Sequence, residues 1–139
     1  MKISKKAEYA IRAVINIARN KNTKPLQISE ISQKESIPIK FLEQILLNLK
    51  NSGILISKRG ANGGYLLAKS PTDISIRMIL DIIDGPFDPI GINTENKLSA
   101  GLEQCFVEMI EIVEGHLGRF TIKNVIEIEE PKGSLVFEI

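Results

Sequence analysis

Three observations predict a mainly α-helical fold with one small β-hairpin. Two short amphipathic segments, 28–34 and 38–51, are separated by a turn of three residues, which is the pattern of a helix-turn-helix. A glycine-rich, basic hairpin follows at 57–69, and apolar residues recur at spacings of three and four over 98–117. This order predicts a winged helix-turn-helix, with the hairpin as its wing, followed by one long helix.

The first two predicted helices are short and amphipathic. The first runs from Lys6 to Arg19 and places its apolar residues at helical spacing: Tyr9, Ala10, Ala13, Val14, Ile17 and Ala18. After a polar run that ends at Pro25, a second helix from Ile28 to Lys34 is expected to turn Ile28, Ile31 and Ser32 inward.

A tight turn of Glu35, Ser36 and Ile37 leads into the third helix. Pro38 suits the first turn of that helix because its missing N–H has no helical partner there. The helix is expected to reach Asn51 and to end at Ser52 and Gly53.

The third helix separates into two faces at 100° per residue. The buried stripe consists of Leu42, Ile45, Leu46 and Leu49. The opposite face carries Lys40, Gln44, Leu47 and Asn51, with Glu43 and Asn48 at its flanks. Amide, ammonium and carboxylate groups of this kind read base edges in the major groove of DNA. Any amphipathic helix has a polar outer face, so the helix alone does not establish this role.

The hairpin pairs two short runs, 54–57 and 65–68. The segment between them contains Lys58, Arg59, Gly60, Asn62, Gly63 and Gly64. Glycine and asparagine tolerate positive φ, and missing side chains allow a close approach to another surface. We expect Lys58 and Arg59 to project towards phosphates or a narrow groove. The alternative is a solvated turn with incidental charges.

Charge is distributed unevenly along a chain whose formal net charge is only +1. Residues 1–70 contain 13 Lys or Arg against four acids, a net +9, whereas residues 71–139 contain five bases and 13 acids, a net −8. A basic half of this kind is the electrostatic pattern of a protein that binds a polyanion such as double-stranded DNA.

The second half begins with a helix that starts at Ser75 and ends at Gly85 and Pro86. A loop over 86–97 precedes the long helix, whose apolar stripe needs a partner surface: Leu98, Leu102, Phe106, Met109, Val113 and Leu117. Thr121 is expected to cap a short helix over 122–128, and 134–139 is apolar enough for a terminal strand. We therefore expect a DNA-binding domain at 1–85, followed by the loop, long helix and C-terminal segment at 86–139.

Several classes of protein are not supported by the 139-residue sequence. No nucleophile and base pair, phosphate-binding loop or metal-ligand spacing appears, so no enzymatic activity is expected. The single cysteine excludes an internal disulfide framework. Neither a signal peptide nor a membrane span of about 18 apolar residues is present, so a cytoplasmic protein is expected.

The chain resembles the bacterial winged helix-turn-helix regulators that include IscR, NsrR and CymR. The resemblance is close over about the first 85 residues and loose beyond them. It rests on KAEYAIRAVINIA at 6–18, ISEIS at 28–32, IPIKFLEQIL at 37–46, LKNSGIL at 49–55 and SKRGANGGYLLAKSPTDISI at 57–76.

The resemblance implies a sequence-specific transcriptional repressor that binds a partly palindromic operator as a homodimer, with the long helix pairing the subunits. Glu43 and Gln44 match recognition-helix positions of the family, and Arg59 matches the wing arginine that enters the minor groove. Together with the residue patterns, this gives the following candidate DNA-binding residues: Lys40, Glu43, Gln44, Asn51, Ser57, Lys58, Arg59, Gly60, Gly63 and Gly64.

The chain differs in one respect from the cluster-binding members of the family that it resembles. Those members have three cysteines in the loop and at the start of the long helix. This chain has only Cys105, which aligns with the last of them. His116 lies about 16 Å farther along a helix. We therefore expect no iron-sulfur cluster and no other cofactor. Cys105 is a candidate redox sensor, and the alternative is a small core hydrophobe.

A second function remains open from the sequence. The chain would then regulate by binding a metabolic enzyme or another protein partner through its acidic second half, as some cluster-free relatives do.

Overall fold

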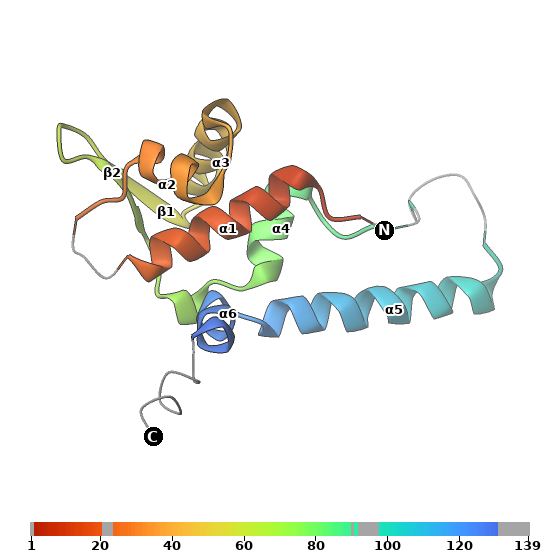
Figure 1. The fold of residues 1–139 in the computed structure, drawn as a ribbon. Coiled ribbons are helices and arrows are strands. Elements are labelled where there is room, and N and C mark those ends of the chain that lie inside the picture. Colours follow the sequence, from red (N-terminus) through yellow and green to blue (C-terminus); the bar gives the residue numbers. More distant parts are fainter. Residues whose placement is uncertain (1, 21–23, 90, 92–97, 131–139) are drawn as a thin grey trace, which may run out of the picture.

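The computed structural model describes residues 2–20, 24–89, 91 and 98–130 (Figure 1). Within them, helices and one antiparallel hairpin confirm the predicted class. The elements in chain order are α1 (Lys5–Arg19), α2 (Ile28–Glu35), α3 (Ile39–Asn51), β1 (Leu55–Lys58), β2 (Gly64–Leu67), the 3₁₀ helix η1 (Pro71–Asp73), α4 (Ile76–Asp84), α5 (Ala100–Arg119) and α6 (Ile122–Glu129).

Side chains cap the N-termini of three helices. Ser4 Oγ accepts a hydrogen bond from the Ala7 N–H at 3.0 Å, and Ser75 Oγ accepts one from Met78 at 3.1 Å. At α6, Thr121 Oγ1 accepts from the Asn124 N–H at 3.1 Å. Each cap satisfies a backbone donor that has no partner inside the helix. The predicted cap at Thr121 is therefore confirmed, and Ser75, predicted to begin its helix, is the N-cap one residue before α4 begins.

One apolar core joins the helix-turn-helix to the rest of the domain. The side of α1 that faces this core is rich in alanine, which lets its neighbours approach closely. The predicted buried stripe of α3 is confirmed, since its four residues are fully covered. The most buried members of the core are Ala10, Ala13, Val14, Ile31, Ile37, Leu42, Ile45, Leu46, Leu49, Ile54, Leu55, Ile74, Ile79 and Ile122.

A polar cluster fastens the helix-turn-helix turn to α1. Glu35 at the end of α2 receives a hydrogen bond from Asn16 Nδ2 at 2.8 Å, and its carboxylate lies 3.5 Å from Arg12 Nε. Arg12 also donates to the Glu35 carbonyl oxygen. Ser36 follows in the left-handed region, with φ 55° and ψ 44°. The half-buried Ser32, expected to face inward, donates to the Ile37 carbonyl oxygen at 2.7 Å.

The second half of the chain lies on the opposite side of α1 from α2 and α3 (Figure 1). α4 packs against α1, α3 and α5, and α6 packs against α1 and η1. Backbone hydrogen bonds of 2.9 Å join Ile122 to Ile74 and Ile76 to Phe120. Because Ile122 is part of the main core, α6 shares the core of the first half. The division of the chain at residue 85 stays a prediction.

Three sequence expectations differ from the structure or lie outside it, and one element of the structure was not expected. Leu98 precedes α5 rather than belonging to it, because the first helical hydrogen bond runs from the Glu103 N–H to the Ser99 carbonyl oxygen. Pro38 is the N-cap of α3 and not its first helical residue. η1 was not expected from the sequence. The strand proposed for 134–139 lies outside the described residues.

The backbone at Ser36 generates a stability prediction. Glycine adopts the left-handed conformation without the penalty that a Cβ imposes. We expect Ser36→Gly to raise the free energy of unfolding by about 0.5–1 kcal/mol, measured by urea denaturation. Ser52→Gly is the matched control because Ser52 ends α3 at φ −90°. An equal or larger gain from Ser52→Gly would contradict this explanation.

Candidate nucleic-acid interface

The outer face of α3 is exposed as the sequence predicted. Lys40, Glu43, Gln44 and Asn51 are all exposed, and Leu47 is 51% exposed. They lie opposite the stripe that packs against the core, so the burial of the stripe fixes which side chains face outward. The face therefore offers two amides, a carboxylate and an ammonium group to an incoming surface.

The wing projects outward on the side of α2 that is farther from α3 in this view (Figure 1). Ser57 pairs with Tyr65 and Lys58 with Gly64 in an antiparallel register, so the turn contains residues 59–63. Lys58, Arg59 and Gly60 are exposed, whereas Ser57 is half-buried. The two basic side chains at this turn are therefore accessible to a ligand.

Gly63 and Gly64 have a structural role in the wing. A Cβ at Gly63 would overlap with the Lys58 carbonyl oxygen, and one at Gly64 would overlap with the Leu26 carbonyl oxygen. Gly64 also has φ +149°, which side chains rarely adopt. The backbone is packed this closely because Leu26 and Tyr65 form an isolated antiparallel bridge, with hydrogen bonds of 3.0 and 2.9 Å.

Ion pairing separates two groups of basic residues in the described part of the chain. Arg12, Arg19 and Arg77 contact Glu35, Glu129 and Glu114, respectively, so their charges are largely compensated. Ten other described bases form no ion pair there. Seven of these ten lie between α1 and η1: Lys24, Lys34, Lys40, Lys50, Lys58, Arg59 and Lys69. The uncompensated positive charge is thus concentrated around α2, α3 and the wing.

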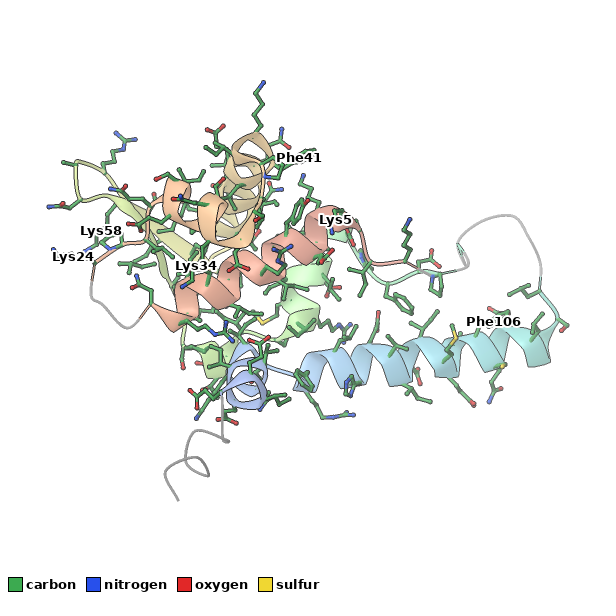
Figure 2. The ribbon with its side chains drawn as sticks, in the orientation of Figure 1. Lys5, Lys24, Lys34, Phe41, Lys58 and Phe106 are labelled. Atoms are coloured by element: carbon green, nitrogen blue, oxygen red, sulfur yellow. The ribbon has the colours of Figure 1, made fainter. Side chains whose placement is uncertain are left out.

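Several exposed residues of this surface were not predicted from the sequence. Figure 2 places Lys24 and Lys58 on the wing side and Phe41 at the start of α3. Phe41 is 52% exposed and its neighbour Ile39 is 46% exposed. At 100° per residue Phe41 shares the flank of Asn48, so a helical projection of α3 would have found it. No sequence signal links Lys24 to the wing, because the link depends on the bridge at Leu26.

Cys105 is exposed on α5. The interpretation of this residue as a small core hydrophobe is therefore wrong for the single chain, because α5 has no buried residue at all.

An iron-sulfur cluster held by thiolates does not fit the donor set, since the sequence offers one thiol per chain. Among the described residues, no group of three or more His, Cys, Asp or Glu is arranged to hold a metal ion. No described helix is long and apolar enough to cross a membrane.

Comparison with known proteins identifies the family. Residues 3–128 match the model of the Rrf2 family, described as iron-dependent transcriptional regulators. IscR of Klebsiella pneumoniae is 27% identical over 94% of this chain and 82% of its own length. An rrf2-like putative regulator of Rhodobacter capsulatus is 41% identical over 63% of this chain and 61% of its own length.

Solved structures agree with this assignment. CymR, the global cysteine regulator of B. subtilis, superposes with a TM-score of 0.84 at 26% identity, over 94% of this chain and 99% of its own. IscR of T. potens has the same fold, with a TM-score of 0.78 at 24% identity, over 98% and 96% of the two chains. The chain belongs to the Rrf2 family of DNA-binding transcription regulators, and its fold is the winged helix of that family.

The contact at Gly64 predicts a large effect of a small substitution. Gly64→Ala should cost about 2 kcal/mol or more of unfolding free energy, because the new Cβ must displace backbone atoms of Leu26. Gly101→Ala is the control, since a Cβ there meets nothing within 4 Å. Thermal unfolding of both variants measures the difference. Equal melting temperatures would contradict the close packing at Gly64.

Proposed function

We propose that this regulator is a sequence-specific repressor that binds a partly palindromic operator as a homodimer. α3 enters the major groove, where Glu43 and Gln44 contact base edges, and Arg59 reaches from the wing into the adjacent minor groove. The observation that carries the proposal is the concentration of exposed, unpaired bases around α2, α3 and the wing. Such a surface attracts the phosphate backbone irrespective of sequence, and the polar face of α3 adds the selectivity.

The proposal of a homodimer is supported by the exposure of α5. The helix has 20 residues and none is buried, although half of its residues are apolar. Leu102 is 43% exposed and Ile112 is 72% exposed. A helix that is apolar on more than one face is normally covered on more than one side. A second copy of the chain supplies that cover and places two recognition helices on one DNA face.

The predicted dimerisation stripe is divided between two environments. Val113 and Leu117 line a groove of about 850 Å³ together with Leu80 of α4 and the N-terminal segment, so they face their own chain. Leu102, Phe106 and Met109 lie nearer the start of α5, and Figure 2 shows Phe106 at the end of the helix far from α6. We assign the subunit contact chiefly to this first part of α5, extended by Ile112, which the stripe did not include.

The same proposal extends to the cofactor and the signal. With one thiol per chain, the regulator acts without a thiolate-held cluster and without a catalytic step, in the cytoplasm where its DNA lies. Exposure makes Cys105 accessible to oxidants, and it is retained as a candidate redox sensor. The alternative function, regulation through a protein partner bound by the second half, is favoured by the exposed apolar residues of α5. The dimer accounts for these same residues.

DNA binding is tested by mapping bound fragments across the genome and measuring affinity for the best site. We expect the logarithm of the binding constant to fall linearly with the logarithm of salt concentration, with a slope of about −0.9 per phosphate neutralised. Arg59→Ala should weaken specific binding by about 1–3 kcal/mol per protomer. Arg119→Ala, which removes an exposed arginine from α5, is the control. Equal losses in both variants would contradict a groove-reading role for Arg59.

Dimerisation is tested by sedimentation equilibrium. Ile112→Asp should weaken the dimer by roughly 3–6 kcal/mol, because the substitution occurs twice and each isoleucine loses its burial. Ile128→Asp changes an isoleucine of α6 that is 69% exposed, and it should leave the dimer intact. A wild-type mass for Ile112→Asp would remove Ile112 from the interface, and a monomeric wild-type protein would refute the homodimer.

A further inference from the structure

The wing rests on the segment that precedes α2 as well as on its own hydrogen bonds. Leu26 bridges Tyr65 through two backbone hydrogen bonds, so the backbone at Leu26 lies directly beside β2 in an isolated antiparallel bridge. Gly64 allows this approach because any side chain there would collide with Leu26. The base of the wing is therefore fixed by backbone contacts that most side-chain substitutions would leave in place.

The turn of the wing has a different attachment. Within residues 59–63, the Gly63 N–H donates to the Gly60 carbonyl oxygen at 2.9 Å, which closes the turn on itself. Among the described residues, one hydrogen bond connects this turn to anything outside the hairpin. Gln27 Nε2 donates to the Ala61 carbonyl oxygen at 3.3 Å. Arg59 lies two residues before that carbonyl, in the same turn.

Gln27 is also the N-cap of α2, the first helix of the helix-turn-helix. Its backbone N–H donates to Glu30 Oε2 at 3.2 Å, which ties the residue to the first turn of that helix. One residue thus links the wing turn to α2, the helix that packs against the recognition helix α3. We propose that Gln27 is a positioning residue that holds Arg59 at a fixed place relative to the recognition helix. This inference rests on the DNA-reading role proposed above for Arg59.

Loss of the Gln27 side chain should weaken DNA binding only through the wing. A free wing turn samples many orientations. The affinity is then multiplied by the fraction of time that Arg59 spends in the binding position. One hydrogen bond supports a loss of about three- to tenfold. Gln27→Ala keeps the backbone N–H that bonds Glu30, which is the half of the α2 capping box that the Glu30 side chain supplies. Gln33→Ala, an exposed glutamine of α2 without a hydrogen bond in the described structure, is the matched control.

A double-mutant cycle on operator DNA tests the proposal. Gln27→Ala should reduce affinity about three- to tenfold when Arg59 is present and have no further effect in the Arg59→Ala background. Gln33→Ala should have the same effect, whatever its size, in both backgrounds. If Gln27→Ala costs the same with and without Arg59, Gln27 contacts DNA or stabilises α2 independently of the wing, and the proposal is overturned.

Limited proteolysis without DNA provides a measurement that does not depend on Arg59 reading DNA. Trypsin cleaves after Lys58 and Arg59, and it acts on the turn only when the turn opens. We expect Gln27→Ala to be nicked there about three- to tenfold faster than the wild-type protein, and Gln33→Ala at the wild-type rate. Equal nicking of all three proteins would overturn the proposal. An Arg59→Ala variant with full DNA affinity, by contrast, would overturn the proposed role of Arg59. The rate of tryptic cleavage would then still test whether Gln27 positions the turn.

Discussion

The arrangement of the DNA-binding surface depends on the packing of α3 against the alanine-rich side of α1. Ala10 and Ala13 are fully covered, and the four apolar residues of the α3 stripe are covered with them. A helix buried along one stripe has no freedom to rotate about its axis, because rotation would expose leucine and isoleucine side chains at about 1.5–3 kcal/mol each. The orientation of Gln44 and Glu43 is therefore determined by apolar residues on the far side of the same helix.

The wing is held by a different kind of contact. Its two strands are only four residues each, too short to be stable alone. The isolated bridge between Leu26 and Tyr65 adds two backbone hydrogen bonds, and this requires a residue without a side chain at Gly64. The same segment leads into α2, so the wing and the helix-turn-helix share one anchor. Gly64 thus acts by allowing this packing, which fixes the base of the hairpin that carries Lys58 and Arg59.

Local patterns predicted most of the fold and part of the interface. Helical periodicity located every α-helix within two residues at each end, and the stripe of α3 separated its buried and exposed residues. Long-range contacts were not predictable in this way. The Leu26 bridge, the ion pairs that compensate Arg12 and Arg19, and the proximity of Lys24 to the wing join residues far apart in the chain, and no spacing rule encodes them. The core position that the apolar surroundings of Cys105 favoured was wrong for the single chain, because no residue of α5 is buried there.

The contacts of α4 connect the exposed helix α5 to the first half of the molecule. α4 lies between them, packing against α1 and α3 on one side and α5 on the other. Arg77 of α4 joins Asp81 and Glu114 at 3.5 and 3.1 Å, but it is 42% exposed, and ion pairs in such positions contribute at most about 1 kcal/mol. The single chain therefore holds α5 mainly near its C-terminal end, where Val113 and Leu117 face α4 and the Ile76 N–H donates to the Phe120 carbonyl oxygen. The first part of α5 is left uncovered by the described chain, and α4 is the element that contacts both α5 and α3.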